Sequence, residues 1–588
     1  MYKHNPMLLC DFYKVCHQAQ YPKGFTKIVS PYTPRMSRLN DTDHITQFGA
    51  QAFCQEYLID VFNEFFFNRP EEEIVKEYVR VLKHTIGEGA YDETRIRDLH
   101  RLGYLPIQVC AVPEGMRTKI GVPQIEISNT HPNFAWLTNA IETLISCYMW
   151  HIQIAAEVGY RYRKIVDKWV DRTCDDNVDP RKVLGDFSMR GQHSPESAIK
   201  ASGAWCLSFD NTATVPAIMW LEDNYKCNCE YDKVGYGAIS FEHSTVTSNY
   251  AVDGNEETLL KRALTEIYPN NNFSFLTDSY DHDNFVENVI PACSKEILEH
   301  NGTILFRGDS GNPVEVIAGI EYIEFNDEED WNEFYSNPEM WLTEYLDFPK
   351  KDEEVIIKYK DEYIKAKMII HYSSERGAYT DCDYRFVYNR EVLLRRDYIP
   401  TVNDMGLIWW LDKHFGHTLN SKGYKVLNSH VKGIYGDSIT PQRAETIYDR
   451  LERKGYAINN VVLGVGSFSF MCLEEFDEDD KVHYKPYTRD TFGVAIKATY
   501  AEDKDGNPIM VYKQPKALAW KKSQKGCCIV SPDGEGYTDE HTFAEVEEAR
   551  NKYNNLLQVI FRNGEMIKTY TLNEVRENMY SKLYERRG

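Results

Sequence analysis

The chain has 588 residues and 42% hydrophobic content, which is enough for a large buried core divided among more than one structural unit. Its formal net charge of -23 argues against nonspecific nucleic-acid binding, because a protein that neutralises phosphates needs a basic face. The sequence has no basic-then-apolar leader and no apolar stretch of membrane-spanning length, so we expect a soluble, cytoplasmic protein with neither a membrane nor a nucleic acid as partner.

A short apolar run, a polar or glycine turn and a helical stretch recur through the middle of the chain. Ser194-Pro195 and Thr440-Pro441 mark helix starts, since a capping hydroxyl precedes a proline suited to a first turn. Alternating strands and helices favour a parallel sheet, and six or seven such units favour an α/β, barrel-like domain that is closed or nearly closed. The runs are VLGDF (183–187), CLSFD (206–210), AISFEH (238–243), FSFLTD (273–278), TILFRGD (303–309), VKGIYGD (431–437) and NVVLGVG (460–466).

The two ends of the chain have a different pattern. Residues 20–37 and 492–515 carry β-branched and aromatic residues broken by Pro and Gly, and residues 559–572 predict a hairpin that turns at Asn563-Gly564. We therefore expect a β-rich second domain built from both termini. The predicted domains are 1–150 (first part of the β-rich and helical domain), 151–317 with 406–490 (barrel-like catalytic domain), 318–405 (acidic insertion) and 491–588 (last part of the β-rich domain).

Polar residues follow several predicted strands at their carboxyl ends, where barrel folds hold their active sites. In ILFRGDSGNP (304–313) an apolar run gives way within three residues to arginine, aspartate, serine and glycine. Any one such residue has a plainer interpretation as a helix cap, whereas ten from separate segments indicate a site for a phosphorylated ligand and Mg²⁺. GxxxxGK[ST] is absent, which excludes a P-loop enzyme. The ten residues are Asp186, Phe187, Arg190, Glu242, His243, Asp278, Arg307, Asp309, Asp437 and Gly466.

Eight motifs, in this order along the chain, resemble the nicotinamide phosphoribosyltransferases, a family of type II phosphoribosyltransferases. The resemblance implies transfer of ribose 5-phosphate from phosphoribosyl pyrophosphate to nicotinamide, giving nicotinamide mononucleotide and pyrophosphate in NAD biosynthesis or salvage. It also implies Mg²⁺ as cofactor and a homodimer with shared active sites. The motifs are NPMLLCDFYKVCHQAQYP (5–22), GDFSMRG (185–191), FEHSTVT (241–247), TDSYD (277–281), RGDSGNP (307–313), NSKGYKVL (420–427), GDSIT (436–440) and TRDTFGVAIKATY (488–500).

The same resemblance assigns roles to individual residues. The nicotinamide ring would stack between Phe187 and Tyr13 of the partner subunit, and His243, with Glu242 beside it, would be phosphorylated by ATP. Without the resemblance, His243 would be interpreted as a hydrogen-bonding residue at a strand end. The other assignments are Arg190 and Arg307 (orientation of acceptor and donor), Asp278 and Asp309 (ribose and Mg²⁺), Gly436 and Asp437 (ribose hydroxyls), Gly466, Ser467 and Arg489 (5-phosphate), and Arg35, Lys497, Lys513 and Lys522 (pyrophosphate).

Three features depart from the family pattern and leave alternatives open. Ala213 stands where the family has an aspartate that accepts a hydrogen bond from the carboxamide, a bond worth about 1–3 kcal/mol, so nicotinate is an alternative acceptor. The acidic stretch 472–487 precedes Arg489; it is either an inert loop or room for an ADP-ribose pyrophosphate donor, which would yield NAD directly. Residues 318–405 form either a lobe for oligomer contacts or a lid.

A non-enzymatic alternative is a ligand-binding regulatory protein that has kept this fold and lost turnover. The joint presence of His243, Asp278, Arg307, Asp309 and Arg489 argues against it, because a binding protein does not need groups that stabilise a departing pyrophosphate.

Overall fold

The structure is a computed structural model that describes residues 3–346, 354–376, 384–436, 438–476, 482–515 and 523–585. The chain forms two compact units. Unit 1 comprises Met1–Arg161, Ser188–Tyr236 and Ser467–Gly588, and unit 2 comprises Tyr162–Phe187 and Gly237–Gly466. These units are defined by internal packing, and the predicted domain boundaries stay a prediction.

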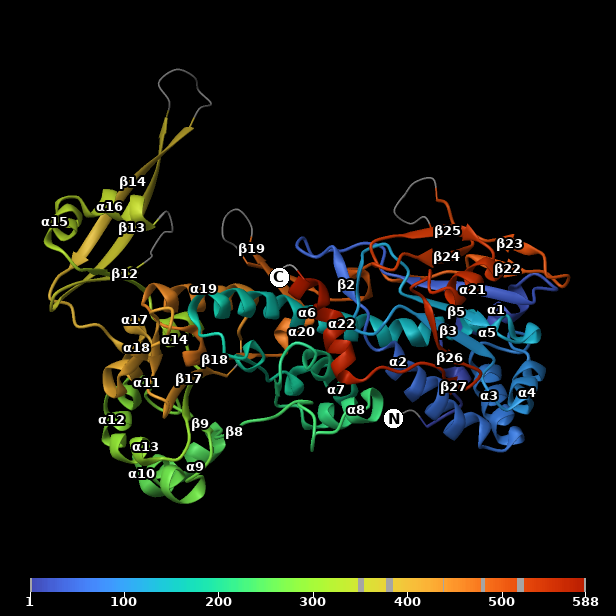
Figure 1. The fold of residues 1–588 in the computed structure, drawn as a ribbon, viewed down its shortest axis with the longest axis horizontal. Helices are drawn as coiled ribbons and strands as arrows, with labels where there is room; N and C mark the ends of the chain where they lie inside the picture. Colours follow the sequence, from blue (N-terminus) through green and yellow to red (C-terminus); the bar gives the residue numbers. More distant parts are fainter. Residues whose placement is uncertain are drawn as a thin grey trace. The chain divides into compact units, whose positions relative to one another are not determined.

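Unit 2 is built on a parallel sheet of short, buried strands. The sheet order has two free edges in the described part of the chain, so it is an open half-barrel rather than a closed barrel. The predicted α/β, barrel-like class is confirmed. In sheet order, the strands of this sheet in unit 2 are β6 (Leu184–Asp186), β18 (Val461–Val465), β17 (Val431–Tyr435), β10 (Ile304–Gly308), β9 (Phe273–Leu276) and β8 (Ile239–Ser240). Figure 1 labels β18, β17, β9 and β8.

One predicted strand is wrong. Residues 206–210 (CLSFD) form turns and loop after α7 (Pro195–Trp205), and the next strand is only the two-residue β7 (Asn211–Thr212). A short apolar run shows that a segment is buried but does not by itself show that it is a strand, and these residues form a buried turn instead. The two predicted helix starts are confirmed: Ser194 caps α7, and Thr440 caps α19 (Pro441–Arg453).

Unit 1 contains an antiparallel sheet that combines strands from both ends of the chain, which confirms the predicted β-rich part. Asn563 and Gly564 both have positive φ, 53° and 85°, as the turn of the predicted hairpin requires. The sheet order is β23 (Pro508–Met510), β22 (Tyr500–Glu502), β1 (Lys27–Thr33), β5 (Ile125–Asn129), β3 (Ile107–Ala111), β26 (Gln558–Arg562) and β27 (Glu565–Met566), with β21 (Ala495–Ile496) paired to β1.

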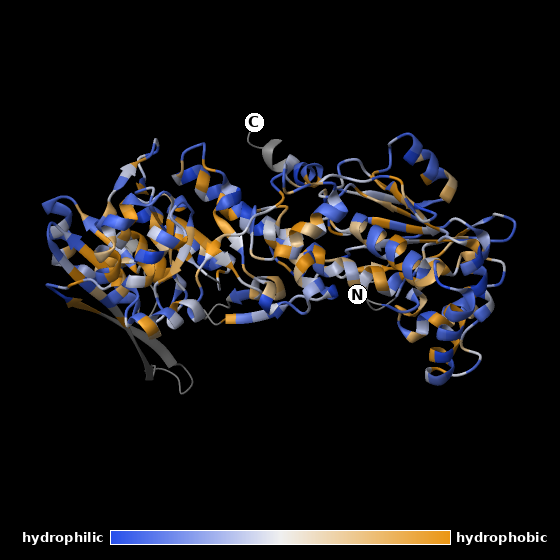
Figure 2. Cartoon of the chain, turned by 90° about the horizontal axis from the view of Figure 1, so that it is seen from below, coloured by the Kyte–Doolittle hydropathy of each residue, from blue (hydrophilic) through white to orange (hydrophobic). Residues whose placement is uncertain are grey.

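Hydrophobic residues, orange in Figure 2, run along the strands and the inner sides of the helices, while hydrophilic residues cover outer helix faces. No helix in the described ranges carries an apolar stretch of the length that a bilayer requires.

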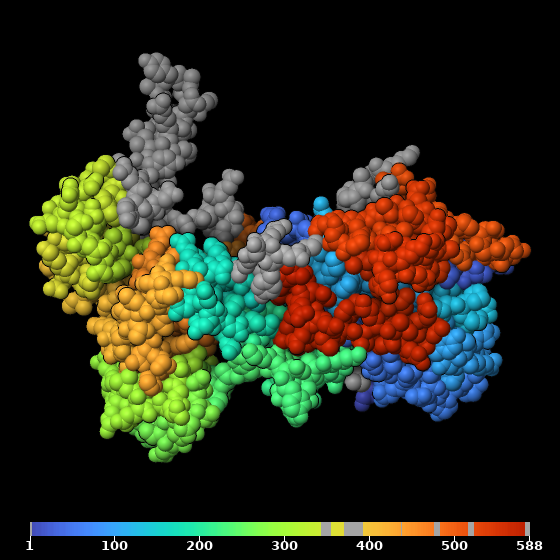
Figure 3. All heavy atoms as spheres, viewed as in Figure 1, coloured from blue at the N-terminus to red at the C-terminus, as the bar shows by residue number. Residues whose placement is uncertain are grey.

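The described residues of the predicted acidic insertion fold as a lobe of unit 2, here called the acidic lobe (residues 319–346, 354–376 and 384–405). Residues 319–346 are yellow-green in Figure 3. The acidic lobe has a hydrophobic core of its own, centred on Phe325, Phe334 and Ile357. A strongly acidic sequence can therefore still bury an apolar face. Its elements are β11 (Glu321–Phe325), α15 (Glu328–Ser336), α16 (Pro338–Leu346), β12 (Glu354–Tyr359), β13 (Glu362–Arg376) and β14 (Tyr384–Arg395), with sheet order β11-β12-β13-β14.

The segment that leads into the acidic lobe, at Gly319, and the segment that leads out of it, at Gly406, lie in direct contact. A Cβ on Gly319 would lie 2.4 Å from the Asp404 carbonyl oxygen, and a Cβ on Gly406 would lie 2.4 Å from the Gly319 nitrogen. The buried Lys454 donates a hydrogen bond to the Met405 carbonyl oxygen at 2.9 Å and another to Ala318. Glycine is needed at positions 319 and 406 because the two backbone segments are too close there for a Cβ atom.

Replacing Phe334 by alanine should loosen the acidic lobe alone. Phe334 is fully buried between Phe325 and Trp341, so its truncation should lower the local stability of the lobe by about 3–5 kcal/mol. Hydrogen exchange of the β12 and β13 amides should accelerate while that of β10 and β17 stays unchanged. Glu333→Gln, on the exposed side of α15, is the control. Equal acceleration in β10 would show that lobe and sheet unfold together.

Candidate functional site

The pairing register aligns the carboxyl ends of three neighbouring strands of unit 2, β9, β10 and β17. Arg307 on β10 lies opposite Leu276 on β9 and Ile434 on β17. Because the strands are parallel, the residues that follow these three positions project from the same edge of the sheet. The residues two positions further along the three segments are Asp278, Asp309 and Gly436, which together with Arg307 are called the strand-end cluster below.

Asp309 connects the members of this cluster. Its Oδ1 accepts a hydrogen bond from the Gly436 N–H at 3.0 Å, and its own N–H donates to Asp278 Oδ2 at 3.1 Å. Its Oδ2 lies 3.2 Å from Arg307 Nε. The Tyr435 hydroxyl donates to the Asp309 carbonyl oxygen at 3.2 Å. One aspartate thus holds the ends of β9, β10 and β17 in fixed relative positions.

Arg307 is held in place from a fourth strand segment. Its Nη1 donates to Ser240 Oγ at 2.7 Å and its Nη2 to the Phe241 carbonyl oxygen at 3.1 Å, both at the end of β8. Its side chain is only 14% exposed. A guanidinium fixed on this many sides presents a preorganised positive charge, which is what a departing anion requires.

His243 lies at the solvent-exposed start of α9 (His243–Asp253), after β8. Its Nδ1 lies 3.2 Å from Ser279 Oγ, one residue beyond Asp278. The N-terminus of a helix favours negative charge, so a phosphate on His243 would be stabilised there. Glu242, directly before it, is exposed, and its N–H donates to Thr245 Oγ1 at 3.3 Å.

Gly464 packs so closely against Gly436 and the Phe187 ring that a side chain at position 464 would not fit. A Cβ on Gly464 would lie 2.4 Å from the Gly436 carbonyl oxygen and 2.7 Å from Phe187 Cδ2. The Phe187 N–H donates to the Val465 carbonyl oxygen at 2.9 Å, which holds its half-buried ring at the end of β6. Gly466, the last residue of unit 2, follows on the same chain segment.

Glu256, a buried carboxyl that the sequence analysis did not identify, lies within electrostatic range of the cluster. Its Oε1 has no hydrogen-bond partner among the described residues. Burial, together with Asp278 and Asp281, raises the pKa of Glu256 to about 7. The only sequence signal was the pair Glu256-Glu257 at a helix start, which is a common capping pattern and carries no catalytic information.

Unit 1 contains a pair of predicted site arginines, Arg35 and Arg489. Arg35 donates from Nε to the Gly493 carbonyl oxygen at 3.0 Å, and Arg489, 57% exposed, lies 3.2 Å from Asp490. Burial and the nearby positive charge of Arg489 lower the pKa of Arg35. Two guanidinium groups that repel one another in this way are stabilised by an anion between them, which suits a phosphate.

Tyr13 and Lys497 both interact with the carboxylate of Glu142 in unit 1. Tyr13, on α1 (Phe12–Gln20), is 55% exposed. Glu142 forms an ion pair with Lys14, and its Oε1 lies 4.0 Å from Lys497 Nζ. Burial and the charge of Glu142 raise the pKa of Tyr13. Two residues almost 500 positions apart in the sequence therefore lie at one corner of unit 1.

The remaining predicted residues fall on exposed turns or outside the described ranges. A Cβ on Gly191 would lie 2.1 Å from Ser467 Oγ, so the turn that carries the exposed Arg190 packs against Ser467. Ala213 is exposed between β7 and α8 (Val215–Tyr225), and Lys513 is exposed. Asp437 and Lys522 lie outside the described residues.

Comparison with known proteins shows the family to which the chain belongs. The family model described as "Nicotinamide phosphoribosyltransferase, N-terminal domain" matches residues 5–108, and that of the nicotinate phosphoribosyltransferase (NAPRTase) family matches residues 393–564. A nicotinamide phosphoribosyltransferase of Acinetobacter baylyi is 30% identical over 592 residues, covering 98% of both chains. The chain belongs to the nicotinamide phosphoribosyltransferase family.

Two further similarities concern more distant proteins. A nicotinamide phosphoribosyltransferase of Xanthomonas campestris is 28% identical over 584 residues, covering 98% of both chains. The crystal structure of nicotinate-nucleotide pyrophosphorylase from Pyrococcus furiosus superposes with a TM-score of 0.49 at 13% identity, covering 99% of this chain and 96% of that one.

The strand-end cluster of this nicotinamide phosphoribosyltransferase family member fits a magnesium ion that a substrate also binds. Asp278 Oδ1 is buried without a hydrogen-bond partner in the described part of the chain, whereas both Asp309 oxygens are engaged by Gly436 and Arg307. Across the described ranges, no three His, Cys, Asp or Glu side chains are grouped closely enough to hold a metal alone. One or two carboxylates suffice for Mg²⁺ when substrate phosphates and water complete its shell.

Gly436→Ala should disable the cluster without unfolding the protein. The added Cβ would lie 2.1 Å from Asp309 Oδ1, so the carboxylate must move away. Because a misplacement of about 1 Å can cost about 100-fold in rate, we expect a loss of kcat of that order in a phosphoribosyl-transfer assay, with the circular dichroism spectrum unchanged. Gly536→Ala, with nothing within 4 Å of the added Cβ, is the control. Unchanged kcat in Gly436→Ala would mean that the position of Asp309 is not critical.

Proposed function

We propose that this protein transfers the ribosyl 5-phosphate group of phosphoribosyl pyrophosphate to the ring nitrogen of nicotinamide. The C1–oxygen bond to pyrophosphate breaks, the C1–nitrogen bond forms, and the products are nicotinamide mononucleotide and pyrophosphate, a step of NAD salvage. The observation that carries this proposal is the strand-end cluster, in which Asp309 holds Arg307 and Asp278 in one arrangement. Membership of the family and the resemblance of the other motifs support it.

The chemistry explains why fixed charges matter in this reaction. Transfer passes through a cation-like ribose carbon between a neutral nucleophile and a departing anion, so positioning and stabilisation of the anion supply most of the rate. We assign Arg307 to this anionic charge and Arg35 with Arg489 to donor phosphates. Phe187 would present one face for the nicotinamide ring.

Mg²⁺ and a second subunit complete the proposal. Asp278, with Asp309 beside it, would hold the ion, which supplies positive charge to the pyrophosphate leaving group. A homodimer would bring Tyr13 of the partner subunit to the second face of the nicotinamide ring. The 55% exposure of Tyr13 supports this role, because a buried tyrosine could not reach another chain's ligand.

The acceptor is assigned without a hydrogen-bonding side chain at position 213. Ala213 cannot accept a hydrogen bond from the carboxamide, and Asp210, three residues earlier, is buried with its Oδ1 3.9 Å from Arg576 Nη2. We assign nicotinamide on the family relationship, and nicotinate is the competitor that a test must include.

An ADP-ribose pyrophosphate donor is a second candidate, favoured by one observation in unit 1. The stretch before Arg489 forms a hairpin, β19 (Cys472–Phe476) and β20 (Val482–Pro486). Phe468 and Tyr484 form an edge-to-face pair at 5.4 Å and are 37% and 59% exposed. Exposed aromatic faces can stack a nucleobase, worth about 1–3 kcal/mol, and Phe468 directly follows Ser467 of the predicted 5-phosphate turn. This donor would give NAD directly.

A product assay tests both candidates. Purified protein with Mg²⁺ receives nicotinamide and nicotinate in competition, once with phosphoribosyl pyrophosphate and once with ADP-ribose pyrophosphate, and products are identified by mass spectrometry. We expect nicotinamide mononucleotide as the main product, and at least about 100-fold less of it with Asp309→Asn, which removes the charge that holds Arg307. Asp505→Asn, on an exposed turn, is the matched control. NAD as the main product would establish the second candidate instead, and wild-type turnover by Asp309→Asn would remove Asp309 from the site.

We also propose that ATP phosphorylates His243 and thereby stimulates turnover. His243→Ala should retain basal transfer and lose the stimulation by ATP, since the exposed His243 lies beside Ser279, one residue beyond Asp278, and is not itself a member of the strand-end cluster. Initial rates with and without ATP, together with phosphohistidine detection on the intact protein, measure this. Ser279→Ala should keep part of the stimulation because the imidazole remains. Full ATP stimulation in His243→Ala would rule the role out.

A further inference from the structure

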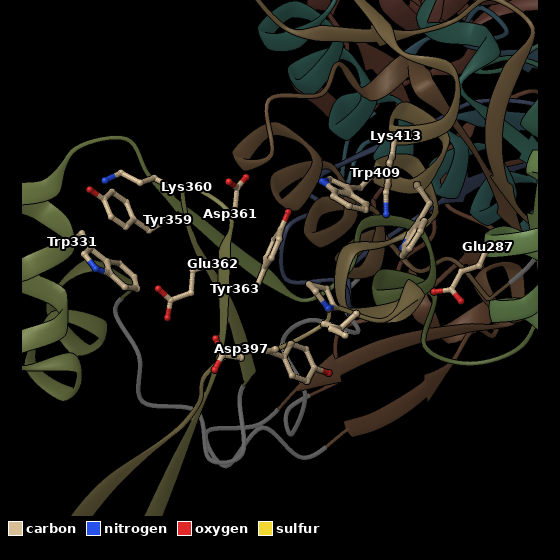
Figure 4. A pocket seen from close by; sticks show the side chains of 14 residues that line it. Glu287, Trp331, Tyr359, Lys360, Asp361, Glu362, Tyr363, Asp397, Trp409 and Lys413 are labelled. Atoms are coloured by element: carbon tan, nitrogen blue, oxygen red, sulfur yellow. The ribbon is translucent and has the colours of Figure 1, made fainter.

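A groove of about 950 Å³ lies in unit 2, away from the strand-end cluster. It is called the lobe groove here and lies between residues 359–363, residues 397–400 and α18 (Leu407–Phe415). Figure 4 shows Asp361 and Tyr363 on the acidic-lobe side and Trp409 and Lys413 on the α18 side. Its volume is at the upper end of the range for ligand pockets, about 300–1,000 Å³.

Two lysines of the chain form cation–π contacts with aromatic rings that line the lobe groove. Lys413 Nζ lies 4.1 Å from the Trp410 ring centroid and 5.3 Å from that of Trp409. Lys360 Nζ lies 4.6 Å from the Tyr359 ring centroid. Trp and Tyr faces attract ammonium and guanidinium groups through their ring quadrupoles, so these walls are suited to positive charge.

The carboxylates of the lobe groove are not neutralised by the chain. Asp361, Glu362 and Asp397 are exposed and, with Glu287 on the opposite side, make no ion pair with any residue in the described ranges. Four carboxylates against Lys360 and Lys413 leave the lining two negative charges in excess. An anionic ligand, a nucleic acid or a second copy of this chain, with its net charge of -23, would meet like charge here.

One donor in the lining lacks an acceptor. Trp410 is 8% exposed, lines the lobe groove, and its Nε1–H has no hydrogen-bond partner among the described residues. A buried indole N–H normally finds an acceptor, because leaving it unsatisfied costs about 1–3 kcal/mol. Its Nε1 is covered by the protein itself, so the exposed aromatic and carboxylate groups of the lobe groove, rather than this N–H, are what a ligand can reach.

We propose that the lobe groove binds an arginine-bearing polypeptide segment of a partner protein. A guanidinium stacks on aromatic faces and pairs bidentately with carboxylates, so it uses both features of the lining. The exposed Ile399, 85% accessible at the rim, offers an apolar contact beside the charges. The acidic lobe is thereby a docking module, and its role is independent of the transfer reaction.

Binding of a defined peptide to the full-length protein tests this proposal. The probe is a fluorescein-labelled, C-amidated peptide Gly-Arg-Leu-Gly-Arg-Gly, compared with the same peptide carrying glutamine for both arginines, by fluorescence anisotropy at 0.15 M salt. We expect saturable binding of the arginine peptide and at least tenfold weaker binding of the glutamine peptide. The variant Asp361→Asn/Glu362→Gln/Asp397→Asn and the variant Trp409→Ala should each weaken binding at least tenfold, with turnover unchanged.

The control separates the lobe groove from general attraction to an acidic protein. Glu266→Gln/Glu329→Gln/Glu333→Gln changes the net charge equally at exposed positions outside the groove and should leave the affinity within twofold of wild type. No saturable binding, equal binding of the two peptides, or equal losses in the two triple variants would overturn the proposal.

Discussion

The Asp309 carboxylate is the interaction on which the site depends. It binds the backbone after β17, lies against the guanidinium of Arg307 on β10, and through its own N–H holds Asp278 after β9. Each of its oxygens has a partner within the protein, and these contacts hold the charges in position before a substrate arrives. Fixed charges cost no reorganisation during reaction, which is the physical advantage of building a transferase site at parallel strand ends.

The acidic lobe is subject to a different constraint: nearly ninety residues are inserted between β10 and β17, and the sheet must keep its geometry. The entering and leaving segments are in contact at Gly319 and Gly406, and Lys454 donates hydrogen bonds to the carbonyl oxygens of Ala318 and Met405. An insertion whose ends lie next to one another leaves the geometry of β10 and β17 unchanged, whatever its own size. The lobe can therefore carry a function of its own, with a hydrophobic core that is separate from its acidic surface.

Much of the fold was predictable because its signals are local. Strands such as FSFLTD and TILFRGD are short apolar runs that end in polar residues, and the hairpin at Asn563-Gly564 has the residues that its turn demands. The run CLSFD failed because apolar character alone does not set backbone conformation. Glu256 was missed because burial raises the pKa of a carboxyl and sequence does not show burial. Ser240, which fixes Arg307, was missed for a similar reason: the hydrogen bond joins residues 67 positions apart.

The sequence by itself determined the family, most of the alternation of strands and helices in the middle of the chain, and the chemical types of the site residues, since these depend on motifs and on the periodicity of apolar residues. Only the tertiary structure decided which of those residues meet. The register of β9, β10 and β17 aligned Asp278, Asp309 and Gly436, and the folding of unit 1 brought Lys497 to the Glu142 that Lys14 also contacts. Register and long-range packing arise from the whole chain burying its apolar surface at once, and no local stretch of sequence encodes that.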